Sequence, residues 1–234
     1  MTEIPGADVD SIAFNDPAYR QAVVDLLGAI AYGELAAFER LVEDASLAPD
    51  LNDKLALGKM AKVQFDHIEP LLARIRDLGA DPAEAMAPFV ASFDEFHAKT
   101  APRDWLEGLV KAYVGDQLAA DFYTEIAAFL DPGTRTLIVD SLDDAGHADF
   151  VVARVTQAIA DDHRVAGRLA LWGRRLMGEA LSQAQRVAAE RDSLAALLAG
   201  GVDRPGLDLA ALTRMFSRLT EGHANRMHAL GLSS

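Results

Sequence analysis

The chain contains no cysteine among its 234 residues. This absence excludes disulfide bonds, thiolate-bound iron–sulfur clusters, a rubredoxin-like iron site and cysteine nucleophiles. The first ten residues, MTEIPGADVD, have neither the positive charge nor the apolar run of a signal peptide. No stretch reaches about 18 uncharged apolar residues, the length that a membrane-spanning helix needs. We therefore expect a soluble, cytoplasmic protein that does not enter a membrane.

Positive charge is scarce as well. The 22 lysines and arginines face 36 acidic residues, which gives a formal net charge of -14. This charge disfavours unspecific binding to nucleic acid or to anionic membranes, although a local basic patch remains open. The sequence shows no convincing strands, repeats or low-complexity segments. With 50% hydrophobic residues, the chain is long enough to bury one sizeable core as a single domain.

The stretch LIVDSLDDAGHADFVV, residues 137–152, places Asp144 and His147 three residues apart within a helical pattern. Residues at this spacing lie on one face of a helix, so both side chains can bind one metal ion. For a single pair, solvated surface residues are favoured by about three to one, because exposed Asp and His are common. The metal hypothesis becomes the better one only because three other predicted helices carry suitable residues at the same height.

The first predicted helix begins at Asp16-Pro17, an N-cap followed by proline, and runs to about Asp44. Glu34 falls within its apolar stripe, so the carboxylate should face the core. An unpaired carboxylate in that position is costly unless it is neutralised, paired or bound to a metal. Residues 1–15 show no period and are expected to form an irregular arm.

The second predicted helix covers about residues 51–78, and its core-facing stripe includes Gln64 and His67. A lone core histidine is more often a hydrogen-bonded packing residue than a ligand. Pro70 lies inside the pattern and leaves the Asp66 carbonyl without a backbone donor. We therefore expect a kink about one turn from His67.

Residues 80–101 are expected to form a crossover with a short helix, whose phenylalanines would make a hydrophobic lid or strap. The third long helix runs from about Pro102 to Leu130 and carries Asp116 on its core face. Asp121 lies about 140° away around that helix and is assigned to its flank.

A fourth helical pattern starts at Asp131-Pro132-Gly133 and ends near Ala160. Residues 16–161 would thus form a bundle, and two further helices within residues 162–234 are expected to pack outside it in the same domain. The first of these is arginine-rich, which favours a solvated outer face over nucleic-acid binding by about three to one. His223 and His228 are five residues apart, a poor spacing for a shared ligand face.

The candidate ligands share one depth in the bundle, because each lies about 14–17 residues from the start of its helix. Short links within each pair of helices and one long link between the pairs are typical of ferritin-like bundles. That architecture holds two metals with Glu from two helices and Glu-x-x-His from the other two. The corresponding residues here are Glu34, Gln64-x-x-His67, Asp116 and Asp144-x-x-His147. We predict an all-α, ferritin-like four-helix bundle with one crossover and two additional C-terminal helices.

A glycine immediately precedes three of the predicted ligands, at Gly33, Gly115 and Gly146. Glycine within a helix costs about 0.5–1 kcal/mol relative to alanine. Close helix packing is one explanation, and room for the ions or a substrate is the other. The sequence leaves both explanations open.

Four segments, GELAAFERL, VQFDHIEPLL, VGDQLAADFY and DDAGHADF, resemble the metal-helix motifs of MiaE-like proteins, which are ferritin-like relatives of the tRNA 2-methylthio-N6-isopentenyladenosine hydroxylase. The resemblance covers roughly residues 20–160. It implies a non-haem diiron enzyme that activates oxygen with electrons from a redox partner. The ligands that it implies are Glu34, His67, Asp116, Asp144 and His147.

The sequence departs from the family pattern at Gln64, where a bridging glutamate is expected, and at Asp116 and Asp144, which are shorter than Glu. Three carboxylates then face the charge of +4 of two ferrous ions. Gln64 is thus a weak ligand at best, and manganese, a single metal or an empty site remain alternatives to two irons.

Two classes of function follow. An enzyme would hydroxylate or desaturate an apolar group of a small molecule or modified nucleoside, with Tyr123 and Asp140 orienting ligands or relaying protons. A non-enzymatic scaffold would keep the site as a buried polar network and use its C-terminal helices to form a homo-oligomer. Ferritin-type iron storage fits less well, because of the two histidines and the long C-terminal extension.

Overall fold

The computed structural model describes residues 16–142, 147–199 and 209–234 of the chain. These residues are overwhelmingly helical, and no strand occurs among them. The predicted all-α, ferritin-like architecture is therefore confirmed.

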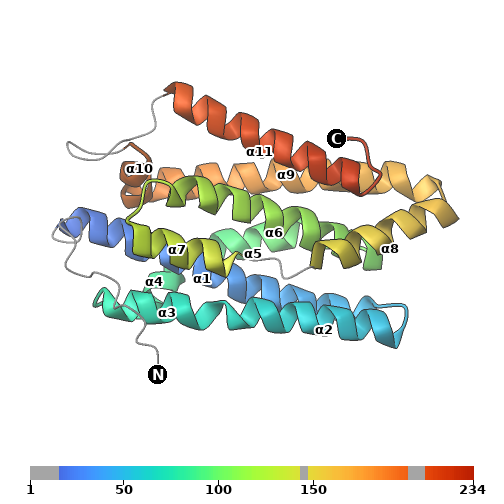
Figure 1. Ribbon diagram of the computed structural model, residues 1–234, viewed down its shortest axis with the longest axis horizontal. Helices are drawn as coiled ribbons and strands as arrows, with labels where there is room; N and C mark the ends of the chain where they lie inside the picture. Colours follow the sequence, from blue (N-terminus) through green and yellow to red (C-terminus); the bar gives the residue numbers. More distant parts are fainter. Residues whose placement is uncertain (1–15, 143–146, 200–208) are drawn as a thin grey trace.

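Four helical columns form the bundle (Figure 1). They are α1 (Pro17–Asp44), α2 with α3 (Leu51–Asp66 and Ile68–Asp77), α6 (Trp105–Ala127), and α7 with α8 (Pro132–Ser141 and His147–Asp161). The chain reverses direction within the first pair of columns and again within the second pair. The crossover between the pairs contains α4 (Pro82–Met86), a short 3-10 helix (Ala87–Phe89) and α5 (Val90–Lys99).

The bundle helices begin where aspartate side chains cap them. Asp16 accepts a hydrogen bond from the backbone N–H of Ala18, and Asp131 accepts one from that of Thr134. Asp50 and Asp104 cap α2 and α6 in the same way. Each cap satisfies a donor that the first turn of a helix leaves free.

The second column breaks at His67, which lies between α2 and α3. Pro70 has no N–H for the carbonyl of Asp66, so the regular hydrogen-bond ladder cannot continue through this turn. The helix is therefore divided near the predicted kink, but the division falls at the predicted ligand His67 itself and not about one turn from it.

The C-terminal part adds α9 (Arg164–Glu190), α10 (Asp192–Ala199) and α11 (Leu209–Ala229). The sequence predicted one continuous helix where α9 and α10 lie. The structure breaks it at Arg191, whose backbone is not helical. After the break, Ser193 donates a hydrogen bond to Asp25 of α1, so α10 is anchored on the first helix of the bundle.

Arginines attach the C-terminal helices to the bundle. On α9, Arg168 pairs with Asp104 and with the buried Glu107. On α11, Arg226 pairs with Asp121 at 2.6 Å, which agrees with the assignment of Asp121 to the flank of α6. The arginine-rich pattern thus binds the bundle's own acids rather than forming only a solvated face.

Two apolar clusters lie at opposite ends of the bundle. One gathers the N-terminal half of α1 with α3 and the end of α6, and the other gathers α2, the start of α6, α8 and α9. The span Pro17–Leu47 is long and apolar enough to cross a membrane by composition, but 67% of the qualifying window is buried within the fold. Its hydropathy is thus accounted for by its place in the core.

Gly28 allows the crossover to contact α1. A Cβ atom added at Gly28 would lie 2.3 Å from the carbonyl oxygen of Ala85, whereas one added at the exposed Gly58 meets nothing within 4 Å. We expect Gly28→Ala to lower the free energy of unfolding by about 1–3 kcal/mol. The matched change Gly58→Ala should raise it by about 0.5–1 kcal/mol. Urea denaturation followed by circular dichroism measures both, and equal effects at the two sites would contradict this account.

Candidate metal centre

A cavity of about 130 Å³ lies between helices of both pairs at mid-height. It lies between the two apolar clusters. The predicted site residues that line it are Glu34, Gln64, His67, Asp116 and Tyr123. The structure therefore brings together the candidates from α1, the second column and α6.

Glu34 is the most deeply buried acid of the cavity, with 6% of the residue exposed. Its Oε2 atom has no hydrogen-bond partner among the described residues and lies 3.7 Å from Nδ1 of His67. Burial raises the pKa of Glu34 above its usual range, and the nearby His67 opposes this shift. The apolar stripe of α1 places this carboxylate in the core, as the sequence predicted.

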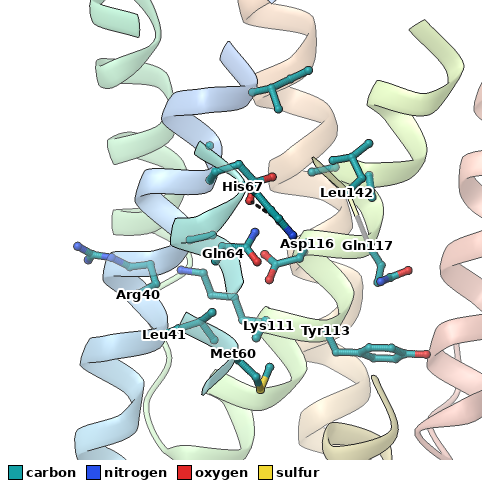
Figure 2. A pocket seen from close by; sticks show the side chains of 18 of the residues that line it. Arg40, Leu41, Met60, Gln64, His67, Lys111, Tyr113, Asp116, Gln117 and Leu142 are labelled. Carbon is teal, nitrogen blue, oxygen red and sulfur yellow. Dashed lines mark ion pairs between the residues drawn. The ribbon is translucent and has the colours of Figure 1, made fainter. Parts of the chain in front are cut away.

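Gln64 and His67 lie one turn apart at the end of α2, and Asp116 approaches from the middle of α6. Figure 2 shows these three side chains pointing toward one another in the cavity. The site thus collects an imidazole, an amide and a carboxylate beside Glu34.

The other two predicted ligands, Asp144 and the side chain of His147, lie outside the described residues. Leu142 and Ala148, which flank this segment, both line the cavity. The roles of Asp144 and His147 stay predictions. Asp140 is exposed and is not among the lining residues, so its position gives no support to a role in orienting ligands.

Tyr123 lines the cavity from α6. A Cβ atom at Gly33 would lie 3.1 Å from the ring of Phe93 and 3.8 Å from the hydroxyl of Tyr123. Close packing therefore explains Gly33. At Gly115, by contrast, an added Cβ would meet nothing within 4 Å, which supports the explanation that this glycine leaves room. Burial, and then the charge of Glu34, raise the pKa of Tyr123, so its hydroxyl stays protonated.

A second group of ionisable side chains lines the same cavity and escaped the sequence analysis. Burial lowers the pKa of Lys111 to about 8, and its Nζ donates to the carbonyl of Thr100 at 2.8 Å. Burial also raises the pKa of Asp44 to about 6, an effect that the charge of Lys111 opposes. The only signal in the sequence was a lysine inside the apolar stretch LVKAYV.

The donor set fits a hard metal ion such as ferrous iron. Carboxylate and imidazole groups suit such ions, and the buried Glu34 oxygen lacks a hydrogen-bond partner in the described part of the chain. Within that part, no three acidic or histidine side chains lie close enough together to hold a metal ion by themselves. A full site therefore needs ligands beyond Glu34, His67 and Asp116.

Fold and cavity together define a ferritin-like bundle with a candidate metal centre. Residues 17–201 match the family model described as a ferritin-like domain of actinomycetes, and the chain belongs to this family. Among solved structures, it resembles protein 19 with aldehyde deformylating oxidase activity from Synechococcus, with 20% identity, a TM-score of 0.71 and 94% of each chain covered. At this identity the likeness shows a shared fold. No curated protein matches the chain.

His97 provides a test of the electrostatics of the cavity. Burial, followed by the charges of Lys111 and Arg40, lowers its pKa from 6.5 to about 3. In the unfolded chain, His97 therefore takes up a proton below about pH 6.5. In the folded chain it does so only near pH 3. The folded state loses stability over that range as the pH falls.

We expect His97→Gln to remove this loss, which amounts to about 2–3 kcal/mol between pH 7 and pH 4.5. Urea denaturation at the two pH values measures the difference between variant and wild type. The exposed His163 supplies the control His163→Gln, which should keep the wild-type dependence. Equal losses in wild type and His97→Gln would contradict the prediction.

Proposed function

We propose that this protein is an oxygen-activating diiron oxidoreductase. The observation that carries the proposal is the buried carboxylate of Glu34, whose Oε2 atom makes no hydrogen bond within the described residues and which faces a cavity together with His67, Asp116 and Gln64. Removing a carboxylate from water without a hydrogen-bonding partner is costly, and a bound cation removes that cost. Membership of the ferritin-like family and the fold shared with an oxidase support the same class.

The residues have distinct parts in this proposal. Glu34, His67 and Asp116 hold the iron, together with Asp144 and His147 from the segment that the sequence assigns to the site. Iron supplies the redox chemistry with oxygen. Tyr123 keeps a proton beside the site and, with Phe93, shields it from water. A hydroxylase activity, which the MiaE-like resemblance implies, is the more specific form of the proposal.

A non-catalytic scaffold is the second candidate, and Gln64 is the observation that favours it. With a neutral amide at this position, three carboxylates balance two ferrous ions incompletely. The 3.7 Å contact between Glu34 and His67 also shows that the buried acid has a partner within the protein.

Anaerobic titration with ferrous iron, followed by exposure to oxygen, separates the two candidates. The diiron proposal expects about two irons per chain and an oxo-bridge absorption in the ultraviolet–visible spectrum after oxygen is admitted. The scaffold expects no bound iron at any loading, and that result would overturn the proposal.

Gln64→Glu tests the charge balance directly. The change adds one carboxylate without changing side-chain length, so the second iron should bind more tightly. A tenfold gain in affinity adds about 1.4 kcal/mol of stabilisation at saturating iron, or roughly 3–6 °C in the unfolding midpoint. Thermal unfolding with and without ferrous iron under anaerobic conditions measures this gain.

The control is Gln185→Glu, which makes the same chemical change at an exposed position and should not alter the response to iron. In a scaffold, Gln64→Glu only adds a buried acid to a cluster of acids and lowers stability near neutral pH. A Gln64→Glu variant that is destabilised and indifferent to iron would count against a diiron centre.

A further inference from the structure

A second cavity, of about 180 Å³, lies beside the candidate metal centre. The two cavities share the wall residues Phe93, Phe96, Gly115, Ala119 and Tyr123. A third side chain of the phenylalanine-rich crossover, the buried Phe89, lines the second cavity only. The phenylalanines of the crossover, which were expected to form a lid or strap, therefore contribute to the wall between the polar cavity and the second cavity.

The second cavity has an almost entirely apolar lining. Its walls come from α1, α5 and α6 on the bundle side and from α9, α10 and α11 on the other. Representative apolar residues are Leu26, Phe122, Ile126, Val187, Leu194 and Leu219. Apolar cavities of this size accept apolar ligands, since one of about 150 Å³ binds benzene. The C-terminal helices thus complete a chamber and do more than cover the bundle.

Gln183 of α9 is one of three polar side chains in this wall, with Ser92 and Tyr123, and it is the one with a buried atom that lacks a hydrogen-bond partner in the described part of the chain. The residue is 8% exposed, and its Oε1 atom has no hydrogen-bond partner among residues 16–142, 147–199 and 209–234. Leaving a buried acceptor unsatisfied is unfavourable, whereas an apolar side chain of the same shape carries no such cost. An amide in this position is therefore matched to a ligand that brings its own hydrogen-bond donor.

Gly115 lies on the boundary between the two cavities. It lines both cavities, and the direction in which its Cβ would point is empty within 4 Å. A larger residue at this position would narrow the boundary. A ligand in the apolar cavity can thus approach the metal centre along α6.

We propose that the second cavity binds the substrate, an apolar chain or ring that carries one O–H or N–H group, and that this group donates a hydrogen bond to Oε1 of Gln183. The other end of the molecule then points past Gly115 and Tyr123 toward the metal centre. The direction of the molecule rests on the proposed function, but binding to the cavity does not.

The test uses two isomers of equal size, 1-octanol and 1-methoxyheptane, of which only the alcohol donates a hydrogen bond. Calorimetric titration of the metal-free full-length protein measures the affinity for each. Wild type should bind both, and one hydrogen bond should favour the alcohol by about fivefold. Gln183→Met should abolish that preference, because it keeps the shape of the side chain and removes the acceptor.

The matched control is Gln185→Met, two residues along α9 at an exposed position, which should keep the wild-type ratio. Comparing the two variants cancels the different solubilities of the probes. Ala184→Phe fills the cavity and should weaken both probes. Thermal unfolding checks that the variants are folded, and Gln183→Met should melt at or above the wild-type midpoint, because it removes an unsatisfied buried acceptor.

The proposal is overturned if neither probe binds the folded wild type, or if Gln183→Met keeps the preference for the alcohol. These outcomes differ from a failure of the proposed function. Iron binding without probe binding contradicts only the proposal that the second cavity binds the substrate. Probe binding by a protein that takes up no iron supports the proposed ligand-binding cavity and contradicts only the proposed diiron centre.

Discussion

The withdrawal of the Glu34 carboxylate from water is the constraint on which the middle of the bundle depends. The residue lies on the face of α1 that also supplies Ile30 and Leu41, which belong to opposite apolar clusters. A charged group between two apolar clusters is stable only where polar groups from other helices gather around it. The imidazole of His67, at the break between α2 and α3, and the carboxylate of Asp116 on α6 are such groups. A polar layer therefore divides the core.

The fold and three of the five predicted ligands follow from the spacing of apolar residues along the sequence. Glu34, His67 and Asp116 are polar residues on apolar stripes, and a stripe of period 3.6 identifies a buried face whatever the partner helix. The structure brings all three to one cavity. Asp144 and His147 rest on the same reasoning, and their side chains lie outside the described residues.

Other features could not be predicted, because they depend on contacts between distant segments. Gln183 and Gln185 are two glutamines of one amphipathic helix, and only the packing of α9 against α5 and α6 buries the first and exposes the second. Burial lowers the pKa of His97, and the charges of Lys111 and Arg40, which come from other helices, lower it further. The division of the fifth helical pattern at Arg191 was missed as well, since the apolar periodicity of the sequence continues across the break.

Because α9, α10 and α11 contribute to the apolar cavity, this cavity can be completed only late in the synthesis of the chain. Proteins emerge from the ribosome N-terminus first, and their domains tend to fold in that order. A nascent chain that ends with α8 already contains the described residues that line the polar cavity, whereas the apolar chamber still lacks Gln183, Leu194 and Leu219. During that interval the apolar wall on α5 and α6 has no partner within the chain. The last third of this protein therefore covers an apolar wall that the earlier two thirds leave open, in addition to shaping the finished chamber.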